Sequence, residues 1–302
     1  MQKSFEDNAI LGPDSLLWRY FGDSRHLLFL GGGSVVQVAH PVVGKGVADH
    51  SVFKTDPYGR LKRSIDLLWP VVYNTAEGVR EYGQKLREQH REIKGTGYDG
   101  KPYFALNPEP YLWVHISAYA LFVAMAEFIE GRPLKGPEKT QMYREWQQLG
   151  RQMGIRDKDM PADIPAYWEY VDKMVLLRLE HNETLDYVMS RAYFVERPQP
   201  PGSKMAHALW VQLRKPLGHI SWICGRAGMP RSFREKFGLQ LSRSEQVQLN
   251  VFSFLLRLLW PLLPERSRWL APAWKAIREA RQYPERFSVS TAVACDQKAT
   301  AA

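Results

Sequence analysis

Apolar residues recur every three to four positions along most of this chain, and this helical spacing predicts an all-α fold. From Ala76 to Lys94, for example, Val79, Tyr82 and Leu86 fall on one side of an expected helix, while most charged residues fall on the other. Alternating patterns typical of strands are scarce. With 302 residues, 45% of them hydrophobic, the chain is long enough to bury a large core.

Start and stop signals divide the chain into helices. Asn107 and Pro108 are suited to the cap and first position of a strongly apolar helix that runs to about Ile129. Gly31-Gly32-Gly33 is expected to form a close-packing turn before a short helix at 35–39, because no phosphate-binding motif surrounds it. The other expected helices span residues 15–21, 60–72, 76–94, 137–153, 161–188, 205–213, 243–259 and 269–283.

The helices beyond the proline-rich segment 197–202 are apolar and need a partner surface, so we expect a single helical domain over residues 14–287. Residues 1–13 and 288–302 are expected to be tails.

Composition excludes several classes of protein. The net charge of +9 is spread along the chain and paired with acidic residues, and no zinc-finger or RNA-binding signature is present, which argues against nucleic-acid binding. Cys224 and Cys295 are too few and too far apart for a disulfide scaffold or a cysteine-ligated metal. The polar N-terminus predicts no signal peptide and a cytoplasmic location. The best candidate for a membrane span, Val251 to Pro264, is too short.

Two histidines lie on helices that are expected to be buried. His90 continues the apolar stripe of the 76–94 helix, and His115 lies in a segment that is apolar nearly all round. A buried imidazole bonded to a backbone carbonyl is the commoner arrangement, and an axial ligand to iron is the alternative. His-Glu-x-x-His is absent, which argues against a zinc hydrolase.

Arg60, Arg63 and Ser64 are three and four residues apart and therefore share one side of a helix. Two guanidinium groups on one face suit a carboxylate or a haem propionate, although a solvated surface cluster gives the same spacing. Asp49 and His50, just upstream, are candidates for an acid or base near this cluster.

The order of these motifs resembles that of an oxygenase family that includes the latex-clearing rubber oxygenases and the MpaB-type enzymes of mycophenolic acid synthesis. The resemblance covers roughly residues 14–240. It implies an all-helical fold with a globin-like core, a b-type haem and, in the rubber oxygenases, cleavage of isoprenoid C=C bonds by dioxygen. The motifs that carry it are Ser15-Leu16-Leu17-Trp18-Arg19, His40-Pro41, Asp49-His50-Ser51, Asp56-Pro57-Tyr58-Gly59-Arg60-Leu61 with Ser64, His90 before Lys94-Gly95, Tyr103 with Asn107-Pro108-Glu109, Trp113-Val114-His115 and Tyr143-Arg144-Glu145-Trp146.

The resemblance also implies roles for individual residues. His90 matches the histidine that ligates the haem iron, Arg60 matches the arginine near the haem, and Ser64 stands where the family has threonine. The chain departs from the rubber oxygenases at Arg63, which replaces a lysine able to ligate iron and stays protonated. The catalytic glutamate has Asp49 as its nearest acidic candidate. His115 is expected to be a buried neighbour of the cofactor.

The hypothesis is therefore a haem b-dependent oxygenase that uses dioxygen on a hydrophobic, unsaturated lipid or isoprenoid, with Arg60 steadying a propionate. A haem or lipid carrier without turnover is a second hypothesis. A third is a peripheral membrane protein that binds through residues 251–286, which hold seven basic and three acidic residues around an apolar face. A core-packing helix pair is the alternative explanation of that pattern.

Overall fold

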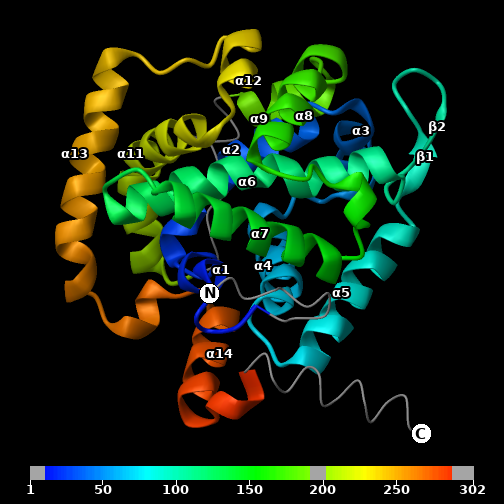
Figure 1. The fold of residues 1–302 in the computed structure, drawn as a ribbon. Coiled ribbons are helices and arrows are strands. Elements are labelled where there is room, and N and C mark those ends of the chain that lie inside the picture. Colours follow the sequence, from blue (N-terminus) through cyan, green and yellow to red (C-terminus); the bar gives the residue numbers. More distant parts are fainter. Residues whose placement is uncertain (1–10, 191–201, 288–302) are drawn as a thin grey trace, which may run out of the picture.

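The computed structural model describes residues 11–190 and 202–287, and the fold there is almost wholly helical (Figure 1). The all-α class predicted from helical spacing is confirmed. A single small antiparallel hairpin, which the sequence pattern did not predict, interrupts the helices between α5 and α6. The α-helices and strands are α1 (Leu16–Tyr20), α2 (Leu30–Val38), α3 (Pro41–His50), α4 (Pro57–Leu68), α5 (Ala76–Arg91), β1 (Lys94–Thr96), β2 (Pro102–Phe104), α6 (Pro108–Glu130), α7 (Gly136–Gln152), α8 (Ile164–Leu177), α9 (Glu183–Met189), α11 (Lys204–Gly228), α12 (Arg231–Lys236), α13 (Arg243–Leu259) and α14 (Ala271–Gln282).

The apolar helix α6 crosses the middle of the molecule, with α7 beside it (Figure 1). Side chains from α1, α2, α7, α8 and α14 join those of α6 in one continuous hydrophobic core. Among the described residues, α6 is also the helix that is long and apolar enough to cross a bilayer, but two thirds of its most apolar window is buried inside the protein. It is therefore a core helix here, and the segment at 251–264 was not the best span candidate.

Gly31, Gly32 and Gly33 lie inside α2 and do not form the expected turn. Close packing, which the absence of a phosphate motif suggested, is found at Gly32. A Cβ on Gly32 would lie 2.4 Å from the carbonyl oxygen of Gly225 in α11, so the backbones of these two helices touch. Only glycine permits so short an approach at this crossing.

Two expected helices have different lengths. The helix predicted over 161–188 is broken into α8 and α9 by a loop in which Asn182 caps α9. The helix predicted over 205–213 continues through Pro216 to Gly228, because its second half packs on α2 and α6. Proline removes one backbone hydrogen bond, and tertiary packing outweighs that loss here.

Most of the predicted tails, residues 1–10 and 288–302, lies outside the described residues. At the inner end of the N-terminal one, Leu11 is buried in the core.

Candidate functional site

His90 lies on the last turn of α5, and its side chain is half-buried rather than enclosed. Its Nδ1 is 2.7 Å from the carbonyl oxygen of Leu86. A carbonyl only accepts, so Nδ1 carries the proton and Nε2 keeps its lone pair. Among the described residues, no hydrogen bond to Nε2 is found. The imidazole is therefore held by one nitrogen and available at the other, the arrangement that metal-bound histidines use.

The start of α6 and the end of α7 position the His90 ring. The ring of Tyr111 meets it edge-to-face at 5.8 Å, and the Tyr111 hydroxyl donates to the carbonyl of Met153 at 2.9 Å. Arg87, one turn before His90, lies over the same tyrosine and donates to the carbonyl of Gly154. These contacts fix the ring orientation without covering Nε2.

Arg60 and Arg63 share α4, as predicted, but their guanidinium groups have different partners. Arg60 donates through Nε to the hydroxyl of Ser51 at 2.9 Å, and its two Nη groups make no hydrogen bond within the described residues. Arg63 is exposed and forms an ion pair with Asp56 at 3.1 Å. Ser64 is exposed one turn after Arg60. Arg60 therefore has N–H donors available for a ligand, whereas Arg63 forms the solvated surface ion pair that its spacing also allowed.

Asp49 and His50 are both engaged near the hairpin. The Asp49 carboxylate accepts from Lys45 at 2.5 Å and from the Tyr103 hydroxyl at 2.9 Å. The hydrogen bond from Lys45 lowers the pKa of Asp49 below its usual value. His50 donates through Nε2 to the carbonyl of Lys94 at 3.2 Å. Within the described part of the chain, no contact joins Asp49 to His90 or Arg60.

His115 is buried, as predicted, in the seam between α6 and α7. Its ring stacks on Trp146 with a centroid distance of 5.2 Å, and Nε2 donates to the Trp146 carbonyl at 3.0 Å. Trp146 returns a hydrogen bond from Nε1 to the carbonyl of His115. Burial lowers the pKa of His115 to about 3, so the imidazole is neutral. His115 is therefore a core histidine that is hydrogen-bonded to the backbone, which was the commoner of the two arrangements considered from the sequence.

His40, another histidine of the family-like motifs, is also structural. It is fully buried and caps α3, where Nδ1 accepts from the backbone N–H of Val42. Nε2 donates to Glu109 at 3.3 Å, and Arg178 binds the same carboxylate. Both ring nitrogens are thus occupied.

Helix α11 carries two side chains of interest that the sequence analysis missed, and one of them reaches α4. The ring of Trp210 lies edge-to-face against Tyr58 of α4 at 6.2 Å. Trp210 Nε1 and Arg214 Nε are buried without a hydrogen-bond partner in the structure as described. A buried donor without a partner is available to an ordered water or to a bound group. Trp210 and Arg214 are four residues apart on a helix without acidic residues, and this spacing could have identified them from the sequence. The predicted helix ended at residue 213, before Arg214.

A b-type haem needs an iron ligand and donors for two carboxylates, and the described residues include side chains of both kinds. No group of three metal-ligating side chains exists among the described residues, but haem iron needs only one protein ligand, and His90 Nε2 is open. The free Nη groups of Arg60 and the unpaired donors of Trp210 and Arg214 suit the carboxylates of such a group.

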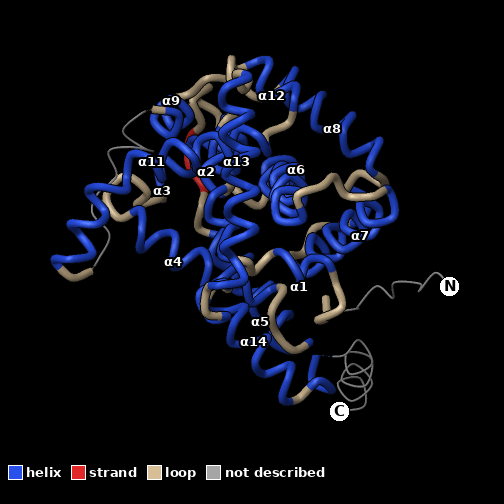
Figure 2. Tube along the Cα trace, turned by 90° about the vertical axis from the view of Figure 1, so that its left-hand side faces the viewer, coloured by secondary structure: helices blue, strands red, loops and turns tan. Residues whose placement is uncertain are grey.

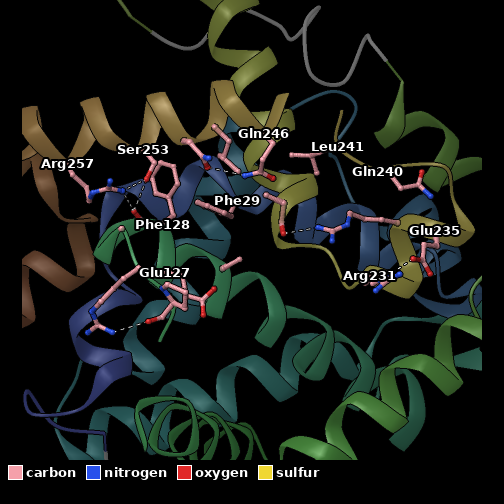
Figure 3. A pocket seen from close by; sticks show the side chains of 18 residues that line it. Phe29, Glu127, Phe128, Arg231, Glu235, Gln240, Leu241, Gln246, Ser253 and Arg257 are labelled. Atoms are coloured by element: carbon pink, nitrogen blue, oxygen red, sulfur yellow. Dashed lines mark hydrogen bonds and ion pairs between the residues drawn. The ribbon is translucent and has the colours of Figure 1, made fainter. Parts of the chain in front are cut away.

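A separate cavity of about 870 Å³ lies between α6, α11, α12 and α13 (Figure 3). None of the site residues predicted from the sequence lines it. Its four arginines are partnered within the protein: Arg231 with Glu235, Arg132 with Glu138, Arg234 with the carbonyls of Arg226 and Ala227, and Arg257 with the carbonyl of Phe128. Its polar lining does not match the apolar channel expected for the substrate.

The chain is similar to a known protein family over most of its length. Residues 18–260 match the family described as "ER-bound oxygenase mpaB/B'/Rubber oxygenase, catalytic domain". Similar proteins include the uncharacterised proteins Rv2237 of Mycobacterium tuberculosis and Mb2261 of Mycobacterium bovis, each 25% identical over 240 residues, which cover 78% of this chain and 89% of the relative. No solved structure matches. The chain thus belongs to the family of MpaB and rubber oxygenase catalytic domains.

Proposed function

We propose that this protein is a haem b-dependent oxygenase that uses dioxygen to cleave a C=C bond in a hydrophobic, unsaturated lipid or isoprenoid. The observation that carries the proposal is the state of His90 in a chain of an oxygenase family: Nδ1 is held by a carbonyl and Nε2 is open. The same proposal includes a globin-like arrangement of helices around the cofactor.

The residues of α4, α5 and α11 would hold the haem. His90 would bind the iron through Nε2, and Arg60 would bind a propionate through its Nη groups. Trp210, which lies against Tyr58 of α4, and Arg214 of the same helix would donate to the cofactor through their unpaired N–H groups. When bound, haem supplies the electron transfer and dioxygen chemistry that side chains lack.

Two catalytic roles stay predictions. The Ser64 hydroxyl is exposed one turn from Arg60 and is free to donate to a polar substrate group. Asp49 acts as a base only if it gives up the proton donors Lys45 and Tyr103, because both hydrogen bonds stabilise its charged form. A shift of the hairpin that carries Tyr103 would be one way to release it.

The test is the visible spectrum of the purified protein with a pyridine haemochrome assay, for wild type, His90→Ala and His50→Ala. We expect a Soret band in wild type and in the control variant His50→Ala, whose imidazole binds only the Lys94 carbonyl. In His90→Ala the band is lost or shifted. A wild-type protein that takes up no haem even after reconstitution contradicts the proposal.

A haem or lipid carrier is the second candidate. It is favoured by the ion pair of Arg63 with Asp56 and by the bonded state of Asp49, since neither group is free for chemistry. Oxygen consumption with an unsaturated lipid separates the two. An oxygenase exceeds the rate of free haem at equal concentration, whereas a carrier does not.

A further inference from the structure

Helix α13 turns an apolar face to solvent. Residues 246–264 contain one charged residue, Arg257, and its guanidinium is directed inward to the carbonyl of Phe128 and to Ser253. The large hydrophobic side chains exposed along this segment are Val247, Val251, Phe254, Leu255, Leu258, Leu259, Leu262 and Leu263. Phe254, Leu258 and Leu262 are 59%, 62% and 78% exposed.

Most of these side chains share one side of α13. At 100° per residue, the exposed residues from Val247 to Leu262 fall on the arc opposite Ser253, which is buried and donates to the Phe128 carbonyl at 3.1 Å. The helix runs along the margin of the molecule in Figure 1 and across the face turned to the viewer in Figure 2. Contiguous exposed apolar surface of this kind marks a binding surface.

The charges beside this face are basic. Glu245 at the start of α13 is neutralised by Arg226, and Glu265 beyond its end is neutralised by Arg281. Arg243 and Arg266 have no ion pair within the described part of the chain, although both are exposed.

The neighbouring helix α11 adds to the basic character. A hydrogen bond of 2.8 Å between His219 and Gln248 ties α11 to α13. Helix α11 exposes Lys204 and Lys215 and contains no acidic residue.

We propose that α13 binds the surface of an anionic lipid bilayer, with the apolar arc from Val247 to Leu262 in the acyl region and Arg243 and Arg266 at the headgroups. An apolar face with basic ends, whose neighbouring carboxylates are paired with arginines, is the pattern of interfacial helices. This surface is narrower than the segment 251–286 suggested by the sequence, because α14 turns its apolar side to the core. The proposal stands independently of haem binding.

Charge complementarity also selects the bilayer over a second copy of the chain. Two copies paired through α13 would place arginines near arginines, with no unpaired carboxylate on either face to neutralise them. Anionic headgroups supply the missing negative charge.

The experiment is co-sedimentation of the full chain with sucrose-loaded vesicles of phosphatidylcholine, with and without phosphatidylglycerol. Wild type sediments with the anionic vesicles, and added salt weakens this binding. Phe254→Glu with Leu258→Glu lowers the partition coefficient by at least about tenfold, and Arg266→Gln lowers it by about fivefold. The matched control is Leu176→Glu with Leu177→Glu, which alters exposed leucines at the end of α8 and leaves binding unchanged.

Light scattering without lipid tests whether a second copy of the chain, rather than a bilayer, binds α13. We expect a monomer, and circular dichroism shows the same fold in both double variants, because all four side chains are exposed. Wild type that stays in the supernatant overturns the proposal. So does a double variant at Phe254 and Leu258 that still sediments like wild type, or a lipid-free dimer which that variant dissociates.

Discussion

The sequence predicted that His115 and His90 both point inward, yet the structure uses them in opposite ways. His115 is sealed between α6 and α7, stacked on Trp146 and bonded to its carbonyl. His90 lies at the end of α5, where a carbonyl holds one nitrogen and the other is open. The difference shows that an apolar stripe identifies the side of a helix that faces inward but not how completely that side is covered.

The largest expected loss of stability is for Trp146→Ala, in the seam between α6 and α7 that encloses His115. Removing the indole leaves a cavity beside His115 and breaks the hydrogen bond to its carbonyl, so we expect a loss of about 3–5 kcal/mol of unfolding free energy. Urea unfolding followed by circular dichroism measures it. The control Tyr111→Phe, near His90, removes only one hydrogen bond and costs about 1 kcal/mol. Equal losses in the two variants would remove the contrast between the regions.

The next largest loss of stability is expected on acidification, and it also acts through the buried His115. The folded pKa of His115 is about 3 and its ordinary value is 6.5, so the unfolded chain takes up the proton first. The stability contributed by neutral His115 is present above pH 6.5 and is lost as the pH falls toward 3. From pH 7 to pH 5 this costs about 2 kcal/mol.

The measurement is urea unfolding at both pH values for wild type and His115→Gln. The variant loses less stability than wild type over this interval. His26, whose pKa is lowered to about 4 by burial, contributes in the same direction in both proteins and cancels in the comparison. A parallel fall in wild type and variant would show that His115 is protonated as easily in the folded state.

Substitution of the two arginines of α4 tests which of them binds the cofactor proposed at His90. Arg60→Gln removes the guanidinium with free Nη groups, and we expect haem affinity to fall by about tenfold or more, as for loss of a charge-assisted hydrogen bond. Arg63→Gln breaks only the exposed pair with Asp56 and changes affinity by less than about twofold. Titration of the apoprotein with haemin measures both. The reverse order would place the cofactor on the Arg63 side of the helix.

The smallest effect on stability is expected for His90→Ala. The imidazole is partly exposed and its one hydrogen bond is to a carbonyl of its own helix, so the apoprotein loses less than about 1 kcal/mol. For the same variant we expect the Soret band to be lost or shifted, and this combination would separate ligation from folding. Thermal unfolding of the apoprotein would contradict this if the variant were as unstable as Trp146→Ala.

The helical class and most helix positions could be predicted because they follow from local rules. Arg243–Leu259 matches α13, and the Asn107-Pro108 start of α6 is found as expected. The errors arise where tertiary contacts outweigh local preference. Pro216 was expected to lie beyond a helix, but packing on α2 and α6 carries α11 through it.

The site was predictable only in part. Spacing placed Arg60, Arg63 and Ser64 on one helix, but it could not show that Asp56 binds Arg63 and Ser51 binds Arg60. Trp210 lies about 150 residues from Tyr58 in the sequence, and no local rule brings them together. A long-range contact of this kind depends on the whole fold, as does the exposure of α13.

The contact of Gly32 with Gly225 has a mechanical consequence for the candidate site. It clamps one end of α11 to α2, while Trp210 lies 15 residues away, about 22 Å along the helix axis. Pro216 lies between the clamp and Trp210 and removes a backbone hydrogen bond, so the arm can bend there. A tilt of α11 by a few degrees about the glycine contact would therefore move the Trp210 indole by an ångström or more relative to Tyr58 of α4.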